Sequence, residues 1–324
     1  MYISQVFSAK SKRVYAIVCA IVLLLLFQGA FQENNNETEI VMKEMISQIG
    51  ELPTFALTLV SFAFFLFPLF FIVKVFHNQS ITQFTTSRKK IDFKRISFSF
   101  LVYGGIIAGT FFLEYFMNPS GYAWNFQPLQ FFMLCIMALL LLPVQIGFEE
   151  YFFRGYFMQW LGLLSKNRWV PLFLSSILFG LAHFANPEVS KMGYKIMFFY
   201  IGMGFLLGIV TLMDDGLELA LGIHFANNFF ACILSTSDWS VFQTPSLFKE
   251  LSAPGIEFYH IILMFTLYLL IIFIFAKKYN WVSWKEKLFR SCYRKLCNST
   301  LAYSCNCYNF TYSFCRSFKY RKNK

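Results

Sequence analysis

The sequence predicts an all-α protein, a polytopic membrane bundle of about eight transmembrane helices, from three observations. Hydrophobic residues make up 57% of the 324 residues and charged residues only 14%, whereas a soluble domain carries about 25% charged residues. The 44 phenylalanines are too many for the interior of one water-soluble globule. The apolar residues gather in stretches of about 20, the length at which a helix crosses a hydrocarbon core of roughly 30 Å. Helices are expected because lipid-exposed backbone groups must be hydrogen-bonded within the chain itself.

Eight stretches have the composition of a membrane span. In order along the chain they are approximately 14–31, 53–76, 96–116, 128–148, 169–185, 196–213, 217–235 and 257–276. The first is similar to a signal peptide, because Lys10, Lys12 and Arg13 precede an apolar run, but no small-residue cleavage site follows it. We therefore expect a retained helix. Closely spaced glycines in two stretches predict tight helix packing; they are Gly104, Gly105, Gly109, Gly202, Gly204 and Gly208.

The formal net charge of +11 belongs entirely to the end of the chain. Residues 1–276 contain 16 basic and 16 acidic residues, and residues 277–324 contain 12 basic residues and one acidic residue, Glu286. A neutral body with a cationic tail excludes a uniformly basic nucleic-acid-binding protein, so no nucleic acid is expected as a partner. The expected surroundings are the lipid bilayer, whose anionic leaflet attracts basic segments.

Lysine and arginine in the connections predict the orientation, because cytoplasmic loops of membrane proteins carry an excess of both. Basic residues precede the first stretch and cluster in the second connection (88–95) and the fourth (166–168). The first connection is rich in glutamate and the third is uncharged. We therefore expect an integral membrane protein with both termini in the cytoplasm, in the cell membrane if the source is bacterial. The turn Asp214-Asp215-Gly216 fits this orientation least well.

Ionisable residues inside membrane spans are costly to insert, and they mark functional sites by default. In this sequence they form three clusters with their polar neighbours: Glu149, Glu150 and Arg154; His183, four residues after Phe179; and His224 with Asn228. Residues four apart on a helix share one face. Glu150 is therefore expected to pair with Arg154, and His224 is expected to project together with Asn228.

The side chains in these clusters are suited to acid–base chemistry. Glu149 points about 100° away from Glu150 on a helix, and a partly desolvated carboxylate without an ionic partner is suited to be a general base near neutrality. Imidazole and amide N–H groups on one helical face, those of His224 and Asn228, are suited to stabilise a developing oxyanion. We expect His183 to act with Glu149 across the bundle.

Together the three motifs resemble those of a known family. The motifs Glu149-Glu150-x-x-x-Arg154, Phe179-x-x-x-His183 and His224-x-x-x-Asn228 are similar, in this order, to those of the CPBP family. This is the CAAX protease and bacteriocin-processing group of Abi-type intramembrane endopeptidases. The resemblance implies that Glu149 activates a water molecule with help from His183. It also implies that Glu150 and Arg154 stabilise the site and that His224 and Asn228 form the oxyanion hole.

The same resemblance implies the substrate class and the catalytic type. The expected protein is a peptidase similar to CAAX prenyl protease 2, acting on a membrane-associated protein or peptide. A glutamate-type mechanism without a cofactor is favoured by the resemblance. Zinc is the alternative, with His183, His224 and Glu149 as its ligands, because catalytic zinc uses three protein ligands and an open position. The H-E-x-x-H motif of soluble zinc peptidases is absent from the sequence.

These observations divide the chain into four parts. Residues 1–127 carry about three transmembrane helices, residues 128–236 the catalytic core, residues 237–276 the last loop and helix, and residues 277–324 a basic cytoplasmic tail. Five of the eight cysteines lie in the tail, with spacings that do not match paired zinc ligands. The sequence leaves the particular substrate, the role of the tail and the oligomeric state open.

Two other interpretations of the polar clusters remain. A Glu–Arg pair inside a membrane is also a packing device, so the protein could be a non-enzymatic membrane adaptor or a bacteriocin-immunity protein whose polar cluster is structural. His260 has no polar companion and is assigned to the membrane interface. A proton-coupled transporter would predict inverted repeats or matched broken helices, which the sequence lacks.

Overall fold

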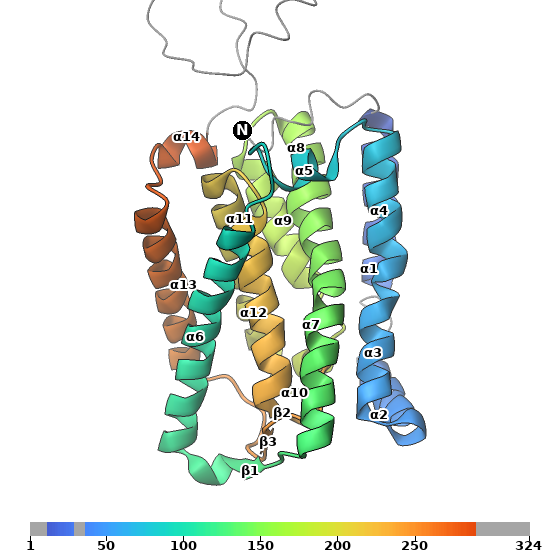
Figure 1. Ribbon diagram of the computed structural model, residues 1–324, viewed down its shortest axis with the longest axis vertical. Coiled ribbons are helices and arrows are strands. Elements are labelled where there is room, and N and C mark those ends of the chain that lie inside the picture. The colour runs from blue at the N-terminus through green and yellow to red at the C-terminus, as the bar shows by residue number, and fades with distance from the viewer. Residues whose placement is uncertain (1–11, 29–35, 290–324) are drawn as a thin grey trace, which may run out of the picture. The chain divides into compact units, whose positions relative to one another are not determined.

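The computed structural model describes residues 12–28 and 36–289, which form a bundle of long helices (Figure 1). The predicted all-α class is confirmed. Each predicted stretch is helical: α1 (Lys12–Gln28), α3 with α4 (Glu51–Ser61 and Ala63–Val75), α6 (Phe93–Met117), α7 (Pro128–Glu150), α9 (Trp169–Leu181), α11 (Met197–Asp214), α12 (Glu218–Leu234) and α13 (Phe258–Lys278). The tail from residue 290 onward, with its five cysteines, lies outside the described residues.

The predicted number of about eight spans is not confirmed. Within the described ranges, five helical segments are long and apolar enough to cross a membrane: Glu51–Val75, Phe93–Met117, Pro128–Ser165, Tyr194–Asp214 and Phe258–Lys278. Three are shorter, namely Arg13–Leu25, Trp169–Leu181 and Glu218–Leu234. Two of the short ones pack among other helices, α9 against α11 and α12 against α6 and α7. A short apolar helix is typical of such an internal position.

Short elements fill the connections. They are α2 (Asn36–Ile49), α5 (Ile81–Thr85), the 3₁₀ turns η3 (Pro119–Gly121) and η5 (Tyr194–Ile196), α10 (Pro187–Met192), α14 (Trp284–Phe289) and three strands, β1 (Tyr122–Trp124), β2 (Ser235–Thr236) and β3 (Phe248–Glu250). The strands form a small sheet in the order β1-β3-β2, with β1 antiparallel and β2 parallel to β3. The sheet and α2 lie at the end of the bundle opposite α5 and α14 (Figure 1).

The helix of the fourth predicted stretch is longer than predicted. From Glu150, α7 continues into a π-helical segment, η4 (Tyr151–Phe157), and then into α8 (Met158–Ser165). The predicted apolar stretch ends at residue 148, although the expected pairing of Glu150 with Arg154 already assumed helix beyond it. Those residues are buried inside the bundle, as is every side chain of η4, so their polarity does not end the helix. A π-helical turn within a helix is frequent at functional sites.

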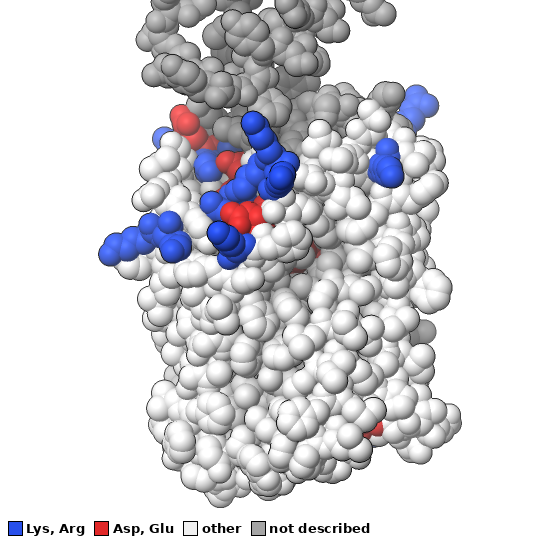
Figure 2. Space-filling view, in the orientation of Figure 1, with Lys and Arg blue, Asp and Glu red and all other residues white. Residues whose placement is uncertain are grey.

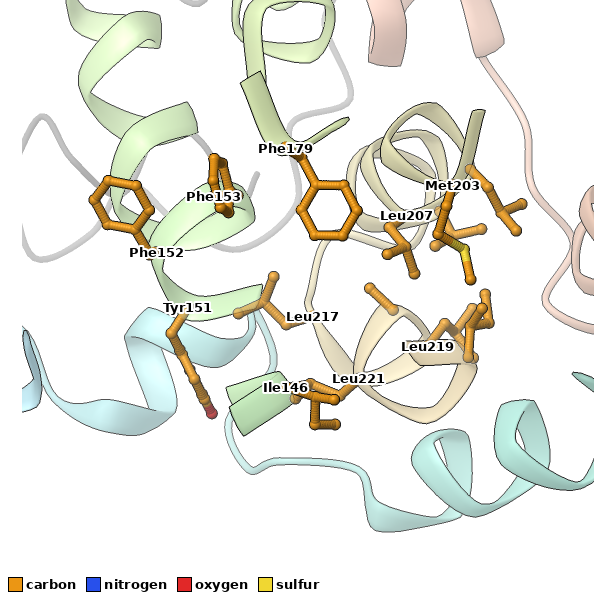
Figure 3. Packing of buried hydrophobic residues seen from close by; sticks show 14 of the residues in the cluster. Ile146, Tyr151, Phe152, Phe153, Phe179, Met203, Leu207, Leu217, Leu219 and Leu221 are labelled. Atoms are coloured by element: carbon orange, nitrogen blue, oxygen red, sulfur yellow. The ribbon is translucent and has the colours of Figure 1, made fainter. Parts of the chain in front are cut away.

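The main core cluster takes side chains from α1, α4, α7, η4, α9, α11, α12 and α13, and Figure 3 shows the part around η4, α11 and α12. Glycine brings two of these helices into backbone contact, since a Cβ atom on Gly204 would lie 2.5 Å from the carbonyl oxygen of Ser176. The packing role predicted for Gly204 is therefore confirmed. The same role is wrong for Gly105 and Gly109, where an added Cβ atom would meet nothing within 4 Å.

On the face shown in Figure 2, the lysine and arginine side chains gather at one end of the bundle. The acidic turn that fitted the predicted orientation least well lies at this end and is neutralised there. Arg88 forms ion pairs with Asp214 at 2.8 Å and Glu218 at 3.2 Å, and Arg95 also pairs with Asp214. The backbone of Thr86 forms a β-bridge with Gly216. The turn is therefore part of the basic end and does not contradict its charge.

Candidate active site

The three predicted clusters come from elements that pack together in the middle of the bundle, where η4 contacts α9 and α7 contacts α12. Glu149 and Glu150 end α7, and Arg154 lies in the following π-helical segment. The motif on α12 lies in the middle of that helix. The predicted helix over 169–185 is four residues too long: α9 ends at Leu181, and His183 lies in the turn after it.

Glu150 and Arg154 form the predicted ion pair, with 2.8 Å between Glu150 Oε1 and Arg154 Nη1. Both side chains are fully buried. Arg154 Nη2 also donates to the carbonyl oxygen of Gly204 at 3.3 Å, and its guanidinium lies 4.0 Å from the ring centre of Phe179. One cation therefore connects η4 with α9 and α11. Buried charges are tolerated when they are paired and hydrogen-bonded in this way.

His224 lies between the two adjacent glutamates. Its Nδ1 atom is 2.8 Å from Glu150 Oε1, and its Nε2 atom is 3.5 Å from Glu149 Oε2. Because a carboxylate accepts, Nδ1 carries a proton in the contact with Glu150. The Nε2 atom then faces Glu149. The sequence predicted that His224 projects together with Asn228, and the structure adds that both of its ring nitrogens face carboxylates.

Glu149 is held from its own helix by a residue that the sequence analysis did not select. Gln145, one turn earlier on α7, donates from Nε2 to Glu149 Oε1. The second oxygen, Glu149 Oε2, is buried and forms no hydrogen bond with the described residues. Glu149 thus has a hydrogen-bond partner within its helix, but this partner is uncharged. The i−4 spacing could have identified Gln145, because residues four apart on a helix share one face.

His183 is oriented by the preceding helix, α9, and by an aromatic ring. Its Nδ1 atom lies 2.8 Å from the carbonyl oxygen of Phe179, and its ring stacks on Tyr200 with 4.6 Å between the ring centres. The carbonyl accepts, so the Nδ1 atom carries the proton and Nε2 is the acceptor of the neutral ring. Within the described residues, His183 bonds to Phe179 and Glu149 bonds to Gln145, with no hydrogen bond joining His183 to Glu149, so their joint action stays a prediction.

Asn228 is fixed by two amides. Its Nδ2 atom donates to Gln145 Oε1 at 2.8 Å, and its Oδ1 atom accepts from Asn227 Nδ2 at 3.1 Å. One of the two N–H bonds of Asn228 is used in the contact with Gln145. The other N–H bond can donate to a further acceptor.

The donors named for zinc do not form a metal site in this structure. Among the residues that the structure describes, no group of three or more His, Cys, Asp and Glu side chains is arranged to hold a metal ion. The Nδ1 atoms of both site histidines face protein acceptors, and His224 Nε2 lies 3.5 Å from Glu149 Oε2. These contacts leave the Nε2 atom of each ring as the position at which it could bind a metal.

Known proteins match the segment that contains this site. Residues 128–230 match the sequence model of the family described as type II CAAX prenyl endopeptidase Rce1-like, which confirms the family resemblance. The uncharacterized protein YyaK of Bacillus subtilis (strain 168) is 38% identical over 168 residues, which are 50% of this chain and 55% of that relative. The match thus spans about half of the relative's length. No solved structure matches the chain. The matched family and the five apolar helices together indicate an integral membrane protein.

Proposed function

We propose that this protein, whose residues 128–230 carry an Rce1-like domain, is an intramembrane endopeptidase that hydrolyses a peptide bond of a membrane-associated protein or peptide. The observation that carries the proposal is the state of Glu149. Its carboxylate is buried, one oxygen is held by a neutral amide, and the other oxygen faces a histidine without being hydrogen-bonded. Such a carboxylate is prepared to receive a proton from a water molecule.

The proposed reaction uses the site as a set of proton acceptors and donors. Glu149 Oε2 accepts a proton from a water molecule, and His183 accepts a hydrogen bond from the same water. The resulting hydroxide attacks the substrate carbonyl carbon. The free N–H of Asn228 donates to the oxyanion of the tetrahedral intermediate, and so does the Nε2–H of His224 when the ring carries a proton on both nitrogens. Protonated Glu149 then gives its proton to the leaving amine, and the intermediate collapses to an acid and an amine. The ion pair of Glu150 with Arg154 holds His224 through its Nδ1 atom.

The family name and the site support CAAX-type peptides as substrates and a glutamate-type mechanism. We expect the purified protein in liposomes to cleave a quenched fluorescent peptide that ends in a farnesylated CAAX sequence. The rate should be unchanged after dialysis against a chelator and should not correlate with bound zinc measured by mass spectrometry. Loss of activity on chelation, restored by zinc, would contradict the glutamate type. Failure of the wild-type protein to cleave the peptide would contradict the CAAX-type activity.

The arrangement of charge supports an orientation with both termini in the cytoplasm. The basic loop 86–95 lies at the same end of the bundle as α14, which carries Lys285 and Lys287 (Figure 1), and basic connections are retained in the cytoplasm. A cysteine introduced by Lys90→Cys is expected to react with a membrane-impermeant maleimide only after the cells are permeabilised, in a background from which the reactive native cysteines have been removed. Equal labelling in intact cells would contradict this orientation.

A further inference from the structure

A directional chain of side-chain hydrogen bonds runs from α12 to the carboxylate of Glu149. Asn227 Nδ2 donates to Asn228 Oδ1 at 3.1 Å, and Asn228 Nδ2 donates to Gln145 Oε1 at 2.8 Å. Gln145 Nε2 then donates to Glu149 Oε1. Each of the two later amides accepts at its oxygen and donates at its nitrogen. The chain ends on the carboxylate to which we assign the role of general base.

The amide of Gln145 has one favourable orientation. The side chain is 5% exposed and lies on α7, one turn before Glu149. A rotation of the amide by 180° would place Oε1 against the carboxylate of Glu149 and Nε2 against Asn228 Nδ2. Two repulsive contacts would replace two hydrogen bonds, and in a buried, low-dielectric site both changes cost more than they would in water. Gln145 therefore orients both of its neighbours.

This orientation has two consequences for the proposed chemistry. First, Glu149 Oε1 is occupied, so Oε2 is the oxygen left to take a proton from water. Second, one N–H bond of Asn228 is directed at Gln145, so the other has a defined direction for donation. A single neutral amide thus sets the separation between the proton acceptor on α7 and the oxyanion donor on α12.

We propose that Gln145 is a positioning residue of the peptidase, which couples the general base Glu149 to the oxyanion donor Asn228. This assignment rests on the proposed function. Gln145 acts through its two neighbours and has no assigned contact with the substrate. Displacements of about 1 Å in an active site can lower a rate by about 100-fold, so loss of this amide should affect the chemical step more than substrate binding.

A substitution of Gln145 removes none of the other charged groups around Glu149. On α12, His224 Nε2 lies 3.5 Å from Glu149 Oε2. Glu150 and Arg154 follow on the same continuous helix and are paired with each other. His183, after α9, interacts electrostatically with Glu149. A change in the pH dependence of a Gln145 variant therefore reports the lost amide contact.

The test compares two variants of Gln145 with a matched control, using liposomes and the farnesylated CAAX peptide. Gln145→Met keeps the length of the side chain and removes both hydrogen bonds. We expect kcat to fall by about 10- to 100-fold with KM within about threefold. The acidic limb of the kcat–pH profile should move to higher pH by about one unit, because a hydrogen bond to the ionised carboxylate is lost.

Gln145→Glu separates positioning from simple packing. A protonated carboxyl group at this position can donate to Glu149 and accept from Asn228, so activity should recover in the acidic part of the profile. Activity should fall as pH rises, because the new carboxyl group ionises and repels Glu149. The control is Gln159→Met in α8, a fully buried glutamine that accepts from Tyr15 at 3.3 Å, outside the site. This variant should keep the wild-type kcat and pH profile.

The outcomes distinguish the two proposals. If Gln145→Met keeps the wild-type kcat and pH profile while Glu149→Gln is inactive, the assignment of Gln145 is wrong and the proposed function stands. If Gln145→Met does not fold, the Gln145→Glu variant decides instead. A Gln145→Glu pH profile equal to that of the wild type would also show that the assignment of Gln145 is wrong. If Glu149→Gln is as active as the wild type, the proposed function fails, and the assignment of Gln145 fails with it.

Discussion

Replacing Glu149 with glutamine is expected to lower kcat for the farnesylated peptide by about 10²- to 10⁴-fold, the usual contribution of a general base. Glutamine has nearly the same shape, and its oxygen can still accept from Gln145. It cannot take a proton from water. The measurement is kcat and KM of the purified variant in liposomes, together with its yield from membranes and its thermal unfolding temperature. KM, yield and unfolding temperature should stay close to those of the wild type.

The control for this change is another glutamate. Glu250 is partly buried in β3, at the end of the bundle that carries the small sheet, and Glu250→Gln is expected to leave kcat unchanged. If Glu149→Gln reduces yield and activity in proportion, the polar cluster serves the fold, as expected of a non-enzymatic adaptor or immunity protein. If Glu149→Gln cleaves at the wild-type rate, another group is the base and the proposed mechanism is wrong.

The sequence was sufficient for contacts that lie within one helix. The pairing of Glu150 with Arg154 follows from their spacing, because residues four apart share a face whatever surrounds the helix. The same rule could have found Gln145 beside Glu149. The apolar stretches also predicted where the long helices lie, because a stretch of apolar residues long enough to span lipid has few alternatives to a helix.

Contacts between helices could not be predicted, because they depend on how each helix is rotated and how closely it is packed. Nothing in the spacing indicates that His224 lies between two glutamates or that Asn228 meets Gln145. The number of spans is not confirmed for a related reason: the short apolar helices α9 and α12 pack against other helices, and composition alone does not distinguish a protein environment from lipid. The acidic turn at Asp214 agrees with the predicted orientation because Arg88 and Arg95 pair with it, and these contacts between segments could not be predicted from the sequence.

Replacing Arg154 with methionine is expected to have the largest effect on stability, lowering the free energy of unfolding by about 3–5 kcal/mol, because the buried charge of Glu150 loses its partner. Methionine also cannot donate to Gly204 or lie as a cation over Phe179. The free energy is measured by unfolding the purified protein in mixed micelles of SDS. Adding Glu150→Gln to Arg154→Met should recover part of the loss, because the double variant buries no unpaired charge at this position.

An exposed ion pair provides the matched control. Lys249 and Asp238 are 2.8 Å apart, but their side chains are 38% and 73% exposed. Lys249→Met is therefore expected to cost less than about 1 kcal/mol. The double variant of Glu150 and Arg154 should stay inactive even where its stability recovers, because the neutral replacement no longer supplies the charge that holds His224 between two carboxylates. An Arg154→Met protein as stable as Lys249→Met would show that the buried ion pair does not hold η4, α9 and α11 together. An active double variant would show that the reaction does not require the carboxylate of Glu150.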